Sequence, residues 1–117
     1  MTEADSNERL RRADRLRSAK DYRRVNRTGS RTAGRHFVAQ RAPGHDPSRA
    51  SLGLVVSRKV GNAVARNRVK RRVREWFRRH REEFAPGGDD IVVIARRGAA
   101  ELPPGATAAE LSKLVKR

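Results

Sequence analysis

The chain has 117 residues, enough for one domain with a modest core, and no cysteine, which excludes disulfides, thiol catalysis and cysteine-ligated zinc. Lysine and arginine total 29 against 13 acidic residues, a formal net charge of +16 that favours an anionic partner, with nucleic acid first and an anionic membrane second. No apolar run reaches the ~18 residues of a membrane span, and "MTEADSNERLRRADRLR" lacks an apolar signal core. We therefore expect a soluble protein of the cytoplasm.

The N-terminal part predicts a tail and then a short helix. Residues 1–14 are polar and charged without a periodic apolar face, and we expect a flexible tail followed by a single domain over residues 15–117. Ser18, with Asp21 three residues later, matches a capping box that opens a helix. Gly29 is a natural residue for its end.

Two or three strands are expected next, and two of them can be placed. Residues 35–42 form a strand candidate, and residues 43–49, dense in turn formers, predict a hairpin loop. Residues 51–57 predict a strand with Leu52 and Leu54 on one face and Gly53 on the other. The sequence therefore predicts that strands of a small sheet precede the longest helix.

The second half predicts helix, strand and helix. From about residue 63 to residue 83, apolar side chains follow one helical face, and "APGGDD" ends the pattern. The β-branched run at 90–96 is the strongest strand, and Thr107 with Glu110 matches a capping box that opens a final helix. The order indicates an α/β sandwich on a small, mostly antiparallel sheet, with the strands at 51–57 and 90–96 parallel to each other. The apolar face of the long helix is formed by Val69, Val73, Trp76, Phe77 and His80.

The long helix and the turn before it are strongly cationic. From Arg58 to Arg81 there are eleven basic residues and one acid, Glu75. A helix that meets only water interleaves acids and bases, because like charges repel. Its aromatic residues face the sheet, which argues against membrane binding, and no pattern of a double-stranded DNA reader is present. Folded RNA, which surrounds an inserted helix with phosphate for arginine to bind, is the expected partner.

The residues of this region resemble a known family. "SRKVGNAVARNRVKRRVRE" at 57–75 closely resembles the signature of the bacterial ribonuclease P protein family, an Arg-Asn-Arg triplet followed by Lys-Arg and another Arg. The likeness extends to "RLRSAKDYRRVNRTG", "GRHFVAQ" and "DIVVIARRGA", and covers the chain from about residue 15 onward. It implies an α+β fold of α-β-β-β-α-β-α order, a two-layer, ribosomal-protein-like sandwich. Its four-stranded mixed sheet would have an unusual left-handed β-α-β crossover, where the general rule predicts a right-handed one.

The resemblance also implies a function. In that family a catalytic RNA subunit, using Mg²⁺, hydrolyses the phosphodiester bond that releases the 5′ leader of precursor tRNA. The protein binds the catalytic RNA and the leader, and neither a membrane nor a protein partner is expected. The chain would then be an RNA-binding subunit of a ribonucleoprotein endonuclease, required for tRNA processing but without catalytic side chains.

The resemblance assigns nine residues to contact with the RNA subunit: Arg58, Lys59, Asn62, Arg66, Asn67, Arg68, Lys70, Arg71 and Arg74. Asn62 also suits the N-cap of the helix, and the two roles can coexist. Three roles are open to Asn67: orienting its arginine neighbours, binding RNA, or holding a water of Mg²⁺.

For the leader, the resemblance indicates a cleft between the first helix and the sheet. It is formed by Tyr22, Asn26, Val38, Gln40 and Val55, with Arg96 and Arg97 near its end. Asn26 and Gln40 stand where relatives usually carry an aromatic residue. Stacking on an unpaired base contributes about 1–3 kcal/mol, so weaker leader contacts, or a shift to hydrogen bonds, are expected. Tyr22 suits a purely structural role in seating the helix equally well.

Catalysis by the protein itself is not indicated. Nothing in the sequence fixes its three histidines, His36, His45 and His80, as an acid–base pair, and a two-metal nuclease needs several convergent acids. The alternative function is that of a structural RNA-binding protein, such as a small ribosomal protein or an RNA chaperone. Only the ribonuclease P subunit should favour precursor tRNA over mature tRNA once the catalytic RNA is present.

Overall fold

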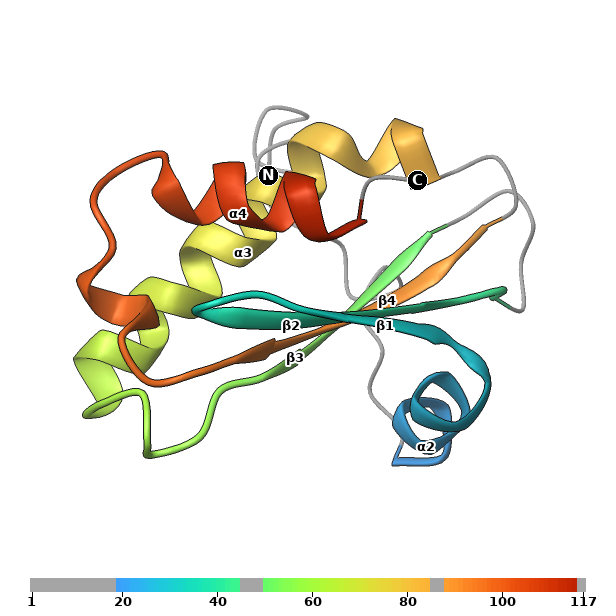
Figure 1. Cartoon of the computed structure of the whole chain (residues 1–117), viewed down its shortest axis with the longest axis horizontal. Helices are drawn as coiled ribbons and strands as arrows, with labels where there is room; N and C mark the ends of the chain where they lie inside the picture. The colour runs from blue at the N-terminus through green and yellow to red at the C-terminus, as the bar shows by residue number, and fades with distance from the viewer. Residues whose placement is uncertain (1–18, 45–49, 85–87, 116–117) are drawn as a thin grey trace, which may run out of the picture.

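The computed structural model describes residues 19–44, 50–84 and 88–115. In chain order the elements are α2 (Ala19–Thr28), β1 (Ser30–Ala33), β2 (Phe37–Ala42), β3 (Ser51–Val55), α3 (Ala63–Phe84), β4 (Asp90–Ala95), the 3-10 helix η2 (Ala99–Glu101) and α4 (Ala106–Val115). Helices α3 and α4 cover one face of the sheet, and α2 lies against the other (Figure 1). The expected α+β order and four-stranded mixed sheet are confirmed. The expected tail and the Ser18 cap lie outside the described residues.

The strand order in the sheet is β1-β2-β4-β3. β2 is antiparallel to both β1 and β4, and β3 is parallel to β4, as the strand–helix–strand pattern predicted. The expectation of a hairpin loop at residues 43–49 is wrong, because β4 lies between β2 and β3. β4, the most apolar strand, lies inside the sheet, where both of its faces are buried. The segment at 43–49 therefore connects β2 and β3, two strands that do not pair with each other.

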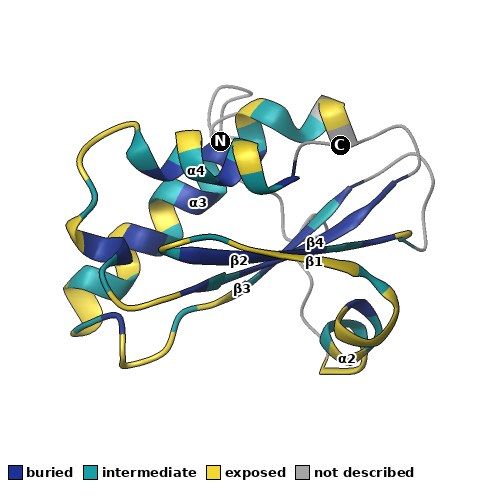
Figure 2. Cartoon of the chain, viewed as in Figure 1, coloured by how far each residue is buried: buried dark blue, intermediate teal, exposed yellow. Residues whose placement is uncertain are grey.

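The two faces of the sheet carry two separate apolar clusters. On one face, Phe37, Leu52 and Ile91 pack with the apolar stripe of α3 and with Leu111 of α4. On the other face, a smaller cluster joins Val25 of α2 to residues of β2 and β4. Figure 2 shows β2 and β4 mostly buried and a narrow buried band on α2. Helix α2 is therefore held by few apolar contacts, so its polar contacts matter more.

Strand β1 was not located from the sequence. Its four residues are all exposed and lack apolar alternation, so no periodic signal marks them (Figure 2). They form the edge of the sheet next to β2. An edge strand of this kind is defined by backbone pairing alone, which composition does not reveal.

The start of α4 differs from the sequence prediction. The helix begins at Ala106, after Gly105 with φ +86°, so Thr107 lies inside the helix and is buried rather than acting as its cap. Glu110 does not return to the helix N-terminus either. Its Oε2 accepts the backbone N–H groups of His36 and Phe37, both at 2.9 Å, and Oε1 lies 2.8 Å from Nδ1 of His36. The capping-box pattern failed because its carboxylate has stronger partners at the start of β2.

Candidate nucleic-acid interface

The cationic region begins with a tight turn that leads into α3. The backbone N–H groups of Val60 and Gly61 donate to the carbonyls of Ser57 and Arg58, at 3.1 and 3.2 Å. Val60 is buried, and its packing fixes a turn whose cationic side chains are exposed. A Cβ on Gly61, at φ +150°, would lie 2.8 Å from Cβ of Ala65, so this glycine allows the chain to enter the helix closely.

Asn62 caps α3. Its Oδ1 accepts the N–H of Ala65 at 2.9 Å, and its carbonyl accepts the N–H of Arg66 at 2.9 Å. The predicted structural role of Asn62 is therefore confirmed, and its contact with RNA remains a prediction. The cap fixes where the helix begins and so which residues face outward.

Helix α3 divides into a buried apolar face and an accessible cationic one. Val69, Val73, Trp76 and Phe77 are at most 2% exposed. Of the nine residues expected to contact RNA, six are exposed (Arg58, Lys59, Asn62, Asn67, Arg68 and Arg71) and three are half-buried (Arg66, Lys70 and Arg74). The structure thus brings the expected set together along one turn and one helix, as a surface that can neutralise several phosphates at once.

Two arginines of α3 also contact the segment after β4. Arg68 donates to the carbonyl of Ala100 at 3.4 Å, and Arg72 donates to that of Leu102 at 2.8 Å. Sequence reasoning gave no such role, because residues 30 positions apart show no spacing signal. Nε of Arg66 is buried and has no hydrogen-bond partner among the residues that the structure describes.

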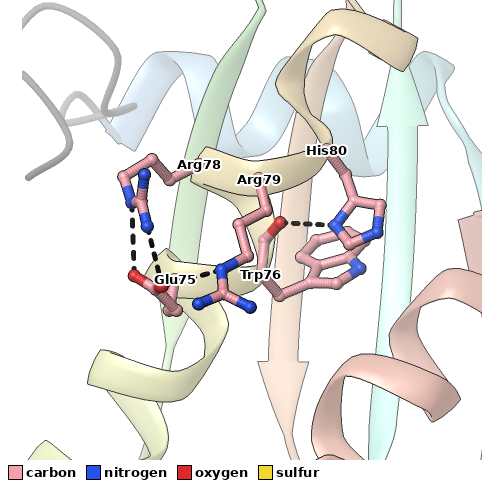
Figure 3. Close-up of polar contacts among 5 residues, drawn as sticks. All are labelled: Glu75, Trp76, Arg78, Arg79 and His80. Atoms are coloured by element: carbon pink, nitrogen blue, oxygen red, sulfur yellow. Dashed lines mark hydrogen bonds and ion pairs between the residues drawn. The ribbon is translucent and has the colours of Figure 1, made fainter. Parts of the chain in front are cut away.

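Glu75, the one acid between Arg58 and Arg81, accepts hydrogen bonds from two arginines (Figure 3). Its carboxylate accepts from Arg78 and Arg79, with shortest distances of 2.8 and 2.9 Å. The hydrogen bond from Arg78, aided by both positive charges, lowers the pKa of Glu75 below its usual value although partial burial opposes the shift. Glu75 therefore stays ionised at neutral pH. Beside it, Nδ1–H of His80 donates to the Trp76 carbonyl at 2.8 Å, and its ring lies over the indole.

On the opposite face of the sheet, Tyr22 seats α2 on β3. Its hydroxyl accepts the N–H of Leu54 at 2.9 Å and donates to the carbonyl of the same residue at 3.3 Å. The ring lies over Gly53, where a Cβ would come within 2.8 Å of it. The structural role left open for Tyr22 is therefore present, and this glycine makes the close approach possible.

Asn26 and Gln40 form a hydrogen bond with each other. Nε2 of Gln40 donates to Oδ1 of Asn26 at 2.7 Å. Gln40 is 3% exposed and Asn26 is exposed, so the pair runs from the sheet to the surface of α2. The bond satisfies a buried amide that would otherwise cost free energy.

The remaining residues of the expected leader set differ in accessibility. Val38 is buried, whereas Val55 is 40% exposed. Arg96 and Arg97 follow β4 and are exposed, and Arg96 donates to the carbonyl of Gly34 at 2.9 Å. Tyr22, Asn26, Val38 and Gln40 thus meet beside α2, on the face of the sheet that α3 does not cover. Only part of this set is accessible.

The acidic and imidazole groups that could serve catalysis have structural partners. Asp89 pairs with Arg41 and Asp90 with Arg24, and both carboxylates are buried. Within residues 19–44, 50–84 and 88–115, no three His, Asp or Glu side chains are placed to hold a metal ion. No helix in the same ranges has the length and apolarity needed to cross a membrane.

Comparison with known proteins decides the family. The family model for ribonuclease P matches residues 10–117. The chain belongs to the ribonuclease P protein family. The ribonuclease P protein component of Syntrophobacter fumaroxidans is 46% identical over 94 residues, which cover 80% of this chain and 78% of that protein. That of Desulforapulum autotrophicum is 38% identical over 104 residues, covering 89% of this chain and 87% of that one.

Solved structures of ribonuclease P proteins share the fold. The protein of Staphylococcus aureus superimposes with a TM-score of 0.80 at 33% identity, covering 90% of this chain and 94% of that one. The protein of Thermotoga maritima gives 0.75 at 36% identity, covering 88% and 96%. A mirror-image connection would not superimpose in this way, so the β3-α3-β4 crossover has the same hand as in those ribonuclease P proteins. The family also places the chain in an endoribonuclease complex.

Proposed function

We propose that this chain is the protein subunit of a ribonucleoprotein endoribonuclease P in the cytoplasm. It binds the catalytic RNA through the cationic face of α3 and the turn before it, and binds the 5′ leader of precursor tRNA beside α2. The observation that carries this proposal is the division of α3, with its apolar residues buried against the sheet and its signature cations accessible. The RNA subunit performs the Mg²⁺-dependent hydrolysis.

The proposed contribution of the protein is electrostatic and positional. Neutralising clustered phosphates lowers the repulsion between two RNA molecules, so that less Mg²⁺ is needed to hold them together. The Asn62 cap and the Val60 turn fix the cations before RNA arrives, which reduces the entropy lost on binding. The RNA holds Mg²⁺, and the protein lowers the concentration that is required.

Cleavage of 5′-labelled precursor tRNA at low Mg²⁺ tests the proposal. The reactions contain the cognate catalytic RNA alone, the protein alone, or both. We expect a cut at the mature 5′ end only when both are present. If the protein adds nothing to the RNA, the subunit function is wrong and the chain is a structural RNA-binding protein.

A competition experiment tests leader recognition separately. With the catalytic RNA present, the complex should bind precursor tRNA more tightly than mature tRNA, and the preference should decrease when the leader is shortened. Equal affinity for the two RNAs would mean that the residues beside α2 do not contact the leader.

A further inference from the structure

A cavity lies between α3 and the start of α4, on the side of the sheet away from α2. Its volume is about 430 Å³, within the range of small-ligand sites. One wall comes from α3, with Trp76, His80, the carboxylate of Glu75 and three arginines (Arg71, Arg72 and Arg79). The other comes from the turn Pro104–Gly105 and from Thr107 and Ala108 of α4. Of the residues expected to contact the RNA subunit or the leader, only Arg71 lines it.

The cavity combines an aromatic wall with fixed cations. The ring of His80 stacks on Trp76 with a centroid distance of 6.0 Å and an interplanar angle of 29° (Figure 3). Nδ1 of His80 is engaged by the Trp76 carbonyl, so the second ring nitrogen remains for a ligand. Arg72 is held by the carbonyl of Leu102 and Arg79 by Glu75, so both guanidinium groups are positioned in advance.

The start of α4 adds a second polar wall. Thr107 is only 4% exposed and lines the cavity, so packing holds its side chain in this wall. The first turn of α4 contains no acidic residue to neutralise the positive end of the helix dipole. A ligand here meets the planar ring of His80, the side chain of Thr107 and positive charge from two helices.

We propose that this cavity binds one unpaired nucleotide of a bound RNA strand, with the base against His80 and the 5′-phosphate between Arg71 and Arg79. The base supplies the planar surface and the acceptor atoms, and the phosphate supplies the charge. An RNA strand is favoured over a free nucleotide because Arg71 also belongs to the exposed cationic face of α3. A strand lying on that face reaches the cavity directly.

Tryptophan fluorescence tests the proposal on the full-length protein, without the catalytic RNA. Trp76 is the single tryptophan of the chain and lines the cavity, so its emission reports on this place alone. The probes are adenosine 5′-monophosphate, adenosine, inorganic phosphate, and a short unstructured RNA oligonucleotide. We expect a saturable change with the monophosphate, tighter binding of the oligonucleotide, and weaker competition by phosphate or adenosine alone.

Three variants locate the site. Arg71→Ala should weaken binding of the monophosphate about tenfold, the effect of losing one charge-assisted hydrogen bond. Arg58→Ala removes the same charge from the turn before α3, outside the cavity, and should change affinity much less. Thr107→Val keeps the shape of the side chain and should weaken binding by removing its hydroxyl.

Glu75→Gln should act in the opposite direction. The glutamine keeps an amide oxygen that can accept from Arg79 and removes a negative charge from the cavity wall, so we expect several-fold tighter binding. An unchanged emission, equal losses in Arg58→Ala and Arg71→Ala, or phosphate competing as well as the monophosphate would overturn the proposal. So would an oligonucleotide that fails to displace the monophosphate, since the ligand would then be a free nucleotide. Because the catalytic RNA is absent, none of these results depends on the proposed role in ribonuclease P.

Discussion

At the scale of single residues, Asn26 and Gln40 form one structural feature. The resemblance led us to expect, at each position separately, the loss of an aromatic surface. In the structure their side chains share a hydrogen bond of 2.7 Å, and Gln40 is almost fully buried. The amide of Gln40 therefore depends on Asn26, and the two positions should respond to mutation as a pair.

Asn26→Ala should lower the free energy of unfolding by about 1–3 kcal/mol, because it leaves a buried amide without its partner. In a Gln40→Leu background the same change should cost much less. Urea unfolding of the four proteins measures this coupling. Asn67→Ala, at an exposed asparagine of α3, is the matched control and should have little effect. Additive costs for Asn26 and Gln40 would show that the bond contributes no stability.

The same bond changes the expected result of restoring aromatic residues. Asn26→Phe alone should fold less stably and gain little leader affinity, since Gln40 is left unpaired beneath the new ring. Asn26→Phe combined with Gln40→Tyr should strengthen leader binding by up to about 1–3 kcal/mol for each stacked base. Binding of precursor tRNA with long and short leaders, in the presence of the catalytic RNA, measures the gain. If Asn26→Phe alone gives the full gain, Gln40 has no part in the site.

At the scale of elements, one close contact helps to set the position of α2 on the sheet. The ring of Tyr22 lies over Gly53 of β3, and its hydroxyl occupies the N–H and the carbonyl of Leu54. Because a Cβ would come within 2.8 Å of the ring, Gly53→Ala should cost about 1–3 kcal/mol through overpacking. In a Tyr22→Ala background the same change should be harmless. A thermal-unfolding cycle of the four proteins measures the difference; equal costs in both backgrounds would mean that Tyr22 does not rest on Gly53.

The same scale shows what the sequence could and could not predict. Helix α3 and strand β3 show apolar periodicity and β4 is a continuous β-branched run, so their existence and the parallel pairing of β3 with β4 could be predicted. Strand β1 and the cavity beside Trp76 depend on contacts between distant segments, which local patterns do not encode. The capping-box pattern at Thr107 and Glu110 was wrong for the same reason, since the partners of Glu110 lie more than 70 residues away.

At the scale of the whole molecule, charge acts on folding and on binding in opposite ways. The net charge of +16 makes the cations repel each other in the compact state, and dissolved salt screens that repulsion. Salt also removes the advantage of releasing counterions from RNA, and so weakens binding. Stability without RNA and affinity for RNA should therefore respond to salt with opposite signs.

Raising the sodium chloride concentration should increase the free energy of unfolding of the isolated protein and decrease its affinity for the catalytic RNA. Each phosphate contacted contributes about 0.7–0.9 to the slope of log K against log salt, so Arg66→Ala with Arg68→Ala should flatten the slope by up to about twice that amount. Urea unfolding and filter binding over the same salt series measure the two quantities. Arg23→Ala with Arg27→Ala, on exposed residues of α2, removes the same charge elsewhere and is the control. If α3 contacts the RNA, the double variant in α3 should flatten the slope more than the double variant in α2. An equal flattening in both would mean that the affinity depends on the total charge of the protein and not on the position of the arginines.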